Sequence, residues 1–84
     1  MPLYLVSYDL MAPGKDYKDL WAALRAVNAV RVLESEWFLR RVNTSPLNLA
    51  NHFLQYMDQN DKILVTEVPD NYAYKNLLAD PTKI

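Results

Sequence analysis

The first run of apolar residues in the chain predicts a buried β-strand over Leu3–Asp9. This stretch is rich in aliphatic and aromatic residues and contains neither Gly nor Pro, which is the composition of a buried strand. On a two-residue period Ser7 and Asp9 share one face, whereas Val6 and Tyr8 take the other. Because both faces are largely apolar, we expect this strand in the middle of a sheet, covered on both sides.

The apolar spacing then changes to that of a helix, predicted over residues 17–27. One helical face carries four apolar side chains, Tyr17, Leu20, Leu24 and Val27. Asp16 is the predicted N-cap, after a turn at Pro13-Gly14. Asn28 is the predicted end of the helix, because Asn tolerates the left-handed conformation in which helices terminate.

Residues 29–43 are too many for one ordinary strand, and we predict a hairpin there. Its arms are Val30–Leu33 and Trp37–Val42, with the turn near Glu34-Ser35-Glu36. This turn contains no Gly, although two-residue hairpin turns favour Gly or Asn. The first half of the second arm is apolar on both faces, so we expect it to be the other central strand, paired with Leu3–Asp9.

A second helix is predicted to begin with Ser45 or Thr44 as its cap and Pro46 at its first helical position. Its predicted buried face consists of Leu47, Ala50, Phe53, Leu54 and Met57. The strand Lys62–Val68 follows a polar turn. The tail, residues 69–84, is predicted either to hold one helical turn or to extend and pair elsewhere.

The predicted element order is strand, helix, strand, strand, helix, strand, which favours an α+β fold. With these connection lengths the natural closure is the ferredoxin-like βαββαβ two-layer sandwich, an antiparallel four-stranded sheet with both helices on one face. The 84 residues form one domain, with its core at residues 2–68. We expect the other sheet face to be bare, and a homodimer is the simplest way to cover it.

Composition excludes several classes of function. The chain has no Cys, so it has no disulfide, thiolate metal site or cysteine nucleophile. Its formal net charge of −1 gives no overall electrostatic case for binding nucleic acid. No apolar stretch approaches the roughly 20 residues that cross a bilayer, and no basic region precedes an apolar run at the start. We therefore expect a cytoplasmic protein with no membrane partner.

Asp9, at the end of the first strand, is the leading candidate for chemistry. Mg²⁺ or Mn²⁺ takes oxygen ligands, and one carboxylate in each subunit is too few to hold such an ion. Two copies of Asp9 brought together by a dimer axis would supply both carboxylates, and the ion would then act on a phosphodiester or a water molecule. The alternative is that Asp9 only accepts hydrogen bonds from the backbone of its own turn.

Three arginines in the middle of the chain, Arg31, Arg40 and Arg41, are candidate contacts for nucleic-acid phosphates. Glu34 and Glu36 lie among them, so the charge signal is mixed.

Three further signals favour structural roles. His52 is the only histidine, which excludes a two-histidine zinc site, and we expect it on the outer face of its helix. Gly14-Lys15 lacks the second Gly and the Ser or Thr of a phosphate-binding loop. The two Trp and six Tyr residues would stack bases if they were exposed on a sheet face, but in so thin a domain they are expected in the core or an interface.

Five short strings carry a resemblance to a known family: Tyr4–Leu10, Pro13–Tyr17, Glu34–Trp37, Asn43–Ser45 and Asp61–Glu67. They resemble small bacterial proteins that are distant relatives of the second CRISPR-associated protein, the nuclease-like subunit of spacer acquisition. The wider group includes the virulence-associated protein D ribonucleases. The resemblance extends over residues 2–68.

The resemblance implies a ferredoxin-like dimer in which Asp9 is the metal ligand, contributed once by each subunit. The Ser that follows the apolar run of the second strand in the family corresponds to Ser35. The chain departs from the CRISPR proteins in its acidic balance, in Glu36-Trp37 after that Ser, and in its tail. Our leading hypothesis is a homodimeric, Mg²⁺- or Mn²⁺-dependent nuclease acting on RNA or DNA. The alternative is a non-catalytic dimerisation or protein-interaction module.

Overall fold

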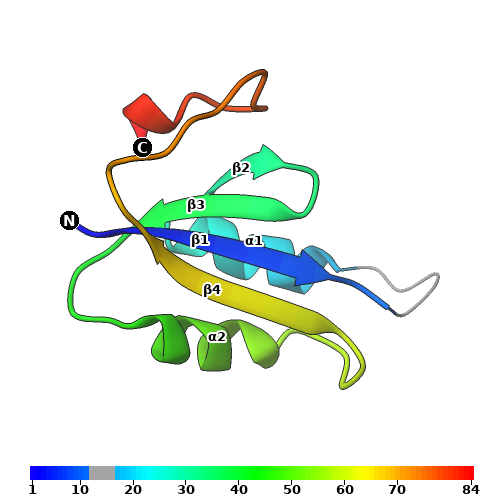
Figure 1. The fold of residues 1–84 in the computed structure, drawn as a ribbon. Helices are drawn as coiled ribbons and strands as arrows, with labels where there is room; N and C mark the ends of the chain where they lie inside the picture. The colour runs from blue at the N-terminus through cyan, green and yellow to red at the C-terminus, as the bar shows by residue number, and fades with distance from the viewer. Residues whose placement is uncertain (12–16) are drawn as a thin grey trace.

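The strand β1 (Leu3–Asp9) lies in the interior of the sheet, as its composition predicts (Figure 1). The computed structural model describes residues 1–11 and 17–84; the predicted turn at Pro13-Gly14, the Asp16 cap and Gly14-Lys15 fall outside them. The sheet has the order β2-β3-β1-β4. The other strands are β2 (Val30–Leu33), β3 (Glu36–Arg40) and β4 (Lys62–Val68).

The predicted α+β class is confirmed: β1 pairs antiparallel with β3 and with β4, and β2 pairs antiparallel with β3. Two helices, α1 (Lys18–Ala26) and α2 (Pro46–Leu54), complete the described regular structure apart from a short 3₁₀ turn. Neither of these helices, nor that turn, is long and apolar enough to cross a membrane.

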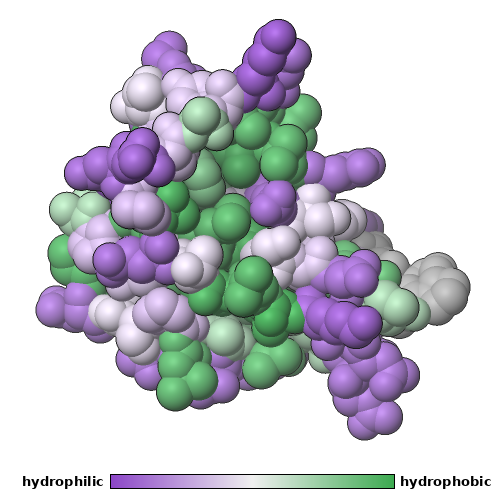
Figure 2. All heavy atoms as spheres, in the orientation of Figure 1, coloured by the Kyte–Doolittle hydropathy of each residue, from purple (hydrophilic) through white to green (hydrophobic). Residues whose placement is uncertain are grey.

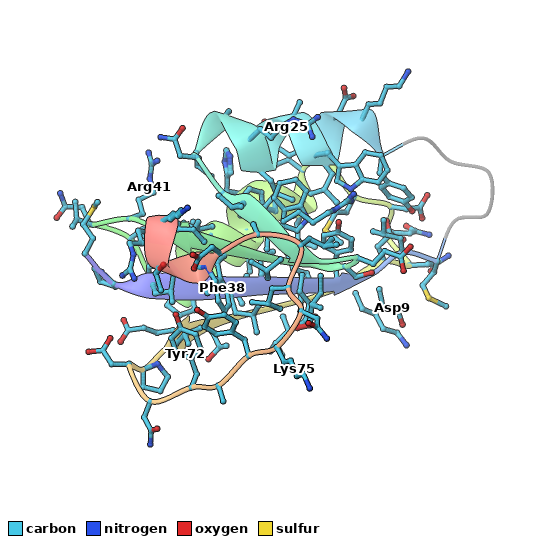
Figure 3. All side chains as sticks on the ribbon, turned by 90° about the horizontal axis from the view of Figure 1, so that it is seen from above. Asp9, Arg25, Phe38, Arg41, Tyr72 and Lys75 are labelled. Carbon is cyan, nitrogen blue, oxygen red and sulfur yellow. The ribbon has the colours of Figure 1, made fainter. Side chains whose placement is uncertain are left out.

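One face of the sheet packs against both helices. Every second residue of β1 contributes to this core, and so does the apolar stripe of each helix. The main buried cluster joins strand and helix residues, among them Tyr4, Val6, Tyr8, Trp37, Leu39, Leu20, Leu24, Leu49 and Phe53. Figure 3 shows α1 on one side of the sheet and the C-terminal tail on the other.

The helix α1 is one residue shorter at each end than its apolar period predicts. Tyr17 and Val27 are its two cap residues rather than its first and last helical ones. Asn28 has φ 62°, so the predicted left-handed end of this helix is confirmed. The spacing of the apolar residues predicts which face of the helix is buried. It does not predict the first and last helical residues, which depend on the local backbone geometry.

The hairpin forms where it was predicted, with a two-residue turn at Glu34-Ser35. β3 begins at Glu36 and ends at Arg40, so the predicted arm Trp37–Val42 started one residue late and ran two too long. The pairing of β2 with β3 shifts register between Arg31 and Leu33. A bulge of this kind bends the strand and increases the local twist.

The helix α2 begins as predicted, but its predicted buried face is wrong in part. The Ser45 hydroxyl accepts a hydrogen bond from the Asn48 N–H at 3.1 Å, and Pro46 opens the helix. Leu49 and Phe53 are its buried residues, whereas Leu47 is 69% and Leu54 44% exposed. Leucines on several sides of this short helix leave the choice of buried side to the tertiary packing.

The sheet face opposite the helices is only partly bare, which corrects the expectation of an open face. Irregular chain from the tail packs over β2, β3 and the beginning of β1, where Leu3, Val32 and Phe38 are buried. The Tyr72 ring meets the Phe38 ring edge-on at 5.8 Å. The Leu78 N–H donates to the Val32 carbonyl at 2.9 Å. The tail thus adds a partial third layer. Of its two predicted alternatives, the helical turn does not form; the tail extends and makes a backbone hydrogen bond to β2 without becoming a regular strand.

The tail ends in a 3₁₀ turn, Pro81–Lys83, which Asp80 caps. The Thr82 hydroxyl donates to Asp80 Oδ1 at 2.7 Å and the Thr82 N–H to the same oxygen at 2.9 Å. These hydrogen bonds, the hydroxyl one above all, lower the pKa of the Asp80 carboxyl from its ordinary value. Asp80 is exposed, so the effect stays local.

Candidate functional site

Asp9 is exposed at the end of β1, on the sheet face that the helices do not cover. Its Cα partner in β4 is Lys62, and the two residues point to the same side of the sheet because directly opposed residues share a face. Both line a shallow hollow of about 180 Å³, hereafter the Asp9 hollow, together with Ser7, Leu64 and two further residues. Figure 3 shows Asp9 on the same side of the sheet as the tail.

The Asp9 carboxylate is not a cap for the described part of its loop. No N–H or hydroxyl of the described residues donates a hydrogen bond to it, and Asp61 takes that role instead. The Asp61 carboxylate accepts hydrogen bonds from the Met11 N–H at 2.7 Å, from the Tyr17 hydroxyl at 2.9 Å and from the Asp58 N–H at 2.7 Å. These bonds join the β4 turn to the segments on both sides of the loop that follows Asp9.

Arg31 is half-buried beside α1, on the helix-covered side of the sheet and not beside Asp9. Its guanidinium sits 5.0 Å from the centroid of the Trp21 ring and 5.2 Å from that of Trp37. Its Nη2 donates to the Tyr8 hydroxyl at 3.3 Å. Both indole N–H groups donate to the same hydroxyl, that of Trp21 at 3.1 Å and that of Trp37 at 3.0 Å.

The aromatic cluster of Tyr8, Trp21 and Trp37 surrounds the Arg31 guanidinium. No carboxylate balances its charge, because Arg31 forms no ion pair with any described residue. The two indole faces stabilise its charge through their quadrupoles. Its Nε is buried and has no hydrogen-bond partner among the described residues. The cluster therefore fixes how α1, β2 and β3 meet, and the Arg31 side chain is committed to that junction.

Arg40 and Arg41 lie at the end of the sheet opposite to Asp9. Arg40 pairs with Leu3, the first residue of β1, whereas Asp9 is the last. Six residues of extended chain span about 20 Å, so the structure does not bring these arginines and Asp9 together within one chain. Figure 3 shows Arg41 and Asp9 at opposite ends of the molecule.

The described residues contain no group of three or more His, Cys, Asp or Glu side chains that would hold a metal ion. Among the described residues, Asp9 is the one carboxylate that lines its hollow, and a cation with the usual oxygen ligands needs more of them. A second Asp9 from another copy has the right chemistry, because two close carboxylates repel and a divalent ion offsets that repulsion.

Two residues near Asp9 escaped the sequence analysis. Lys62 begins the strand that pairs with β1, and the antiparallel register alone would have placed it opposite Asp9. Asp61 carried the signal of a turn acid after Asn60, which is typical of a residue that binds local backbone. Ser35 is exposed in the hairpin turn, and its carbonyl accepts the Tyr8 N–H at 3.1 Å.

His52 stands on α2, where it is half-buried rather than fully solvated. Its ring contacts those of Phe53 and Tyr56 edge-on, at 5.2 and 5.8 Å, so it packs as an aromatic residue.

Comparison with known proteins assigns the chain to no family. No protein-family model matches the chain, and no solved structure matches it. The functional argument therefore starts from the residues themselves.

We predict that Asp61→Ala destabilises the protein by about 1–3 kcal/mol, because it removes the acceptor of three hydrogen bonds. Asp9→Ala, the matched change at the end of the strand that pairs with β4, should alter the free energy of unfolding by less than about 0.5 kcal/mol. Urea denaturation followed by far-UV circular dichroism measures both. Equal losses would show that Asp9 is a structural residue as well.

We predict that Tyr8→Phe lowers the melting temperature markedly, because three N–H donors lose their common acceptor. A loss of about 1–3 kcal/mol is expected for unpaired buried donors, and each kcal/mol corresponds to about 4–8 °C in a domain of this size. Tyr74→Phe is the control, since Tyr74 is 48% exposed. A Tyr8→Phe protein that melts with the control would disprove the role of the hydroxyl.

Proposed function

We propose that this chain is a ferredoxin-like domain that works as a homodimer and cleaves phosphodiester bonds of RNA or DNA. Two copies of Asp9, one from each subunit, would hold a Mg²⁺ or Mn²⁺ ion between them. The residues that resemble the second CRISPR-associated protein and the virulence-associated protein D ribonucleases favour the same activity.

The element order and the strand order support the ferredoxin-like assignment. The described chain runs β1, α1, β2, β3, α2, β4 before its tail, and β1 and β3 are the two interior strands. The split βαβ arrangement has this alternation, with crossover helices returning to the same face of the sheet. Many unrelated functions share this fold, so the function must be argued from Asp9.

The observation that carries the proposal is the state of the Asp9 carboxylate. It is exposed, it ends an interior strand, and no described residue donates a hydrogen bond to it. A carboxylate on a rigid strand end, with its oxygens uncommitted, is ready to bind a cation. In the described part of the loop that follows Asp9, the hydrogen bonds from Met11 and Tyr17 go to Asp61 instead.

The surface beside Asp9 suits a second copy of the chain. Leu64 lines the Asp9 hollow and is 62% exposed, and Leu5, on the same face, is half-buried. Figure 2 shows apolar atoms gathered across the middle of this face. A two-fold axis at this surface would bury Leu64 against its counterpart and bring the two Asp9 residues toward each other.

Each nearby side chain has a defined task in this proposal. The bound ion would supply Lewis-acid activation of the phosphodiester or of a water molecule. Asp9 orients that ion, and Lys62, beside it in the hollow, offers a positive charge to a phosphate oxygen. Arg31 is committed to its aromatic cluster, so the auxiliary phosphate contact near Asp9 falls to Lys62.

A second candidate function is a non-catalytic dimerisation or protein-interaction module. The observation that favours it is β4, a seven-residue edge strand. Such an edge offers backbone N–H and C=O groups to a partner strand. This module would use the same fold without any chemistry at Asp9.

We predict that the protein cleaves RNA or DNA in the presence of Mg²⁺ or Mn²⁺ and that EDTA abolishes the cleavage. Asp9→Asn should lower the rate by at least about 100-fold, because the ion loses its charged ligands. A panel of single- and double-stranded RNA and DNA, incubated with each ion and separated on denaturing gels, measures this.

Asp70→Asn is the matched control, because Asp70 is also an exposed aspartate and follows the far end of β4. It should retain the full rate. Absence of cleavage, or equal cleavage by wild type and Asp9→Asn, would leave the interaction module as the function.

We predict that the protein is a dimer in solution and that Leu64→Lys makes it monomeric without unfolding it. The reason is that Leu64 is exposed in the single chain and would be buried between copies. Leu47→Lys, at a leucine that is 69% exposed on α2, should leave the dimer intact. Sedimentation velocity measures the mass, and a monomeric wild type would contradict the proposal.

A further inference from the structure

Two hollows larger than the Asp9 hollow lie at the end of the sheet far from Asp9. One encloses about 520 Å³ and its neighbour about 250 Å³. They share three lining residues, so we treat them as one site, the basal hollow. Its side chains come from the end of β3, the segment after α1 and the tail, and include Asn28, Arg40, Arg41, Asn43 and Lys83.

The side chains that line the basal hollow are strongly biased in charge. Arg40, Arg41 and Lys83 are cations, and no Asp or Glu side chain is among the described residues that line it. Arg41 and Lys83 are exposed, which leaves their charges accessible. In a chain whose formal net charge is −1, this gathering gives a local positive field that the total charge conceals.

The Arg40 guanidinium is held in place by the backbone. Its Nε donates to the Ile84 carbonyl at 2.9 Å and its Nη1 to the Met1 carbonyl at 3.2 Å. Its Nη2 donates to no described residue, so one donor group of a fixed guanidinium stays available. A donor that is already positioned loses less conformational entropy when a ligand binds.

The rest of the lining is neutral and mixed. Asn28 and Asn43 both have left-handed backbone, with φ 62° and 61°, and shape the bends on either side of the hollow. Val27 and Val42 add apolar wall. Small-molecule sites usually combine apolar walls with a few polar groups in volumes of about 300–1,000 Å³, and the larger hollow is within that range.

We propose that the basal hollow binds the phosphate group of a nucleotide-sized ligand. Phosphate oxygens accept paired hydrogen bonds from arginine, and a dianion suits a site with several cations and no Asp or Glu side chain among its described lining. The apolar and amide walls would contact the remainder of the ligand. This site is separate from the Asp9 hollow, about 20 Å away along β1, and needs no cation at Asp9.

Isothermal titration calorimetry in low-salt buffer without divalent ions tests the proposal on the full chain. The probes are inorganic phosphate, adenosine 5′-monophosphate and adenosine. Adenosine monophosphate should bind most tightly, phosphate more weakly, and adenosine not measurably. No binding of adenosine monophosphate, or binding of adenosine just as tight, would overturn the proposal.

Variants locate the binding. Arg41→Gln and Lys83→Gln should each weaken adenosine monophosphate binding by at least about tenfold, the effect of losing one charge-assisted contact. Arg25→Gln is the matched control, since Arg25 is exposed on α1, does not line the hollow, and is labelled with Arg41 in Figure 3. An equal loss in Arg25→Gln would mean diffuse charge attraction and would overturn the site.

Two further experiments are needed. One distinguishes a free nucleotide from the end of a nucleic-acid strand as the source of the phosphate, and the other distinguishes this site from the proposed nuclease site at Asp9. Short oligonucleotides with and without a 5′-phosphate show whether the site takes a strand end or a free nucleotide; both carry the phosphate chemistry proposed. Asp9→Asn should bind adenosine monophosphate as the wild type does. Cleavage that depends on Asp9 without any binding in the basal hollow would overturn this inference alone.

Discussion

Neighbouring residues of β1 must point to opposite faces of the sheet, and this places Tyr8 and Asp9 on different sides. Tyr8 turns toward the helices, where its hydroxyl accepts hydrogen bonds from Trp21, Trp37 and Arg31. Asp9 turns away and stays exposed. A shift of one residue in the register would exchange the two environments, exposing the aromatic ring and burying a carboxylate. The packing of Tyr8 therefore also decides how Asp9 is presented.

Much of the architecture follows from local patterns in the sequence. β1 and β4 were predicted at their observed bounds, because their apolar runs stop at residues that cannot continue a buried strand. The beginning of α2 followed from the Ser45-Pro46 pair, in which the hydroxyl and the ring both suit the first turn. The exposed position of Asp9 at a strand end was also visible, since a carboxylate at the end of an apolar run has to reach water.

Other features depend on which distant segments meet, and no local pattern reports that. Leu47 and Leu49 are equally apolar, yet only the packing against the sheet buries Leu49. Tyr72 packs against Phe38, but the tail that carries Tyr72 has no regular spacing of apolar residues from which this contact could be predicted. The sequence analysis grouped Arg31 and Arg40 by their charge. The strand pairing places Arg31 against the aromatic rings beside α1 and Arg40 at the end of the sheet beside Met1 and Ile84.

Both tryptophans of the chain contact the same guanidinium, that of Arg31, and this limits what optical spectroscopy can report. Tryptophan emission depends on the immediate surroundings of the two indoles, which means the junction of α1, β2 and β3. The tail contributes only tyrosine rings, with Tyr72 against Phe38 and Tyr74 against Tyr72. Release of the tail from the sheet would therefore leave the emission spectrum nearly unchanged, and a fluorescence-monitored unfolding curve would describe one corner of the molecule rather than the whole.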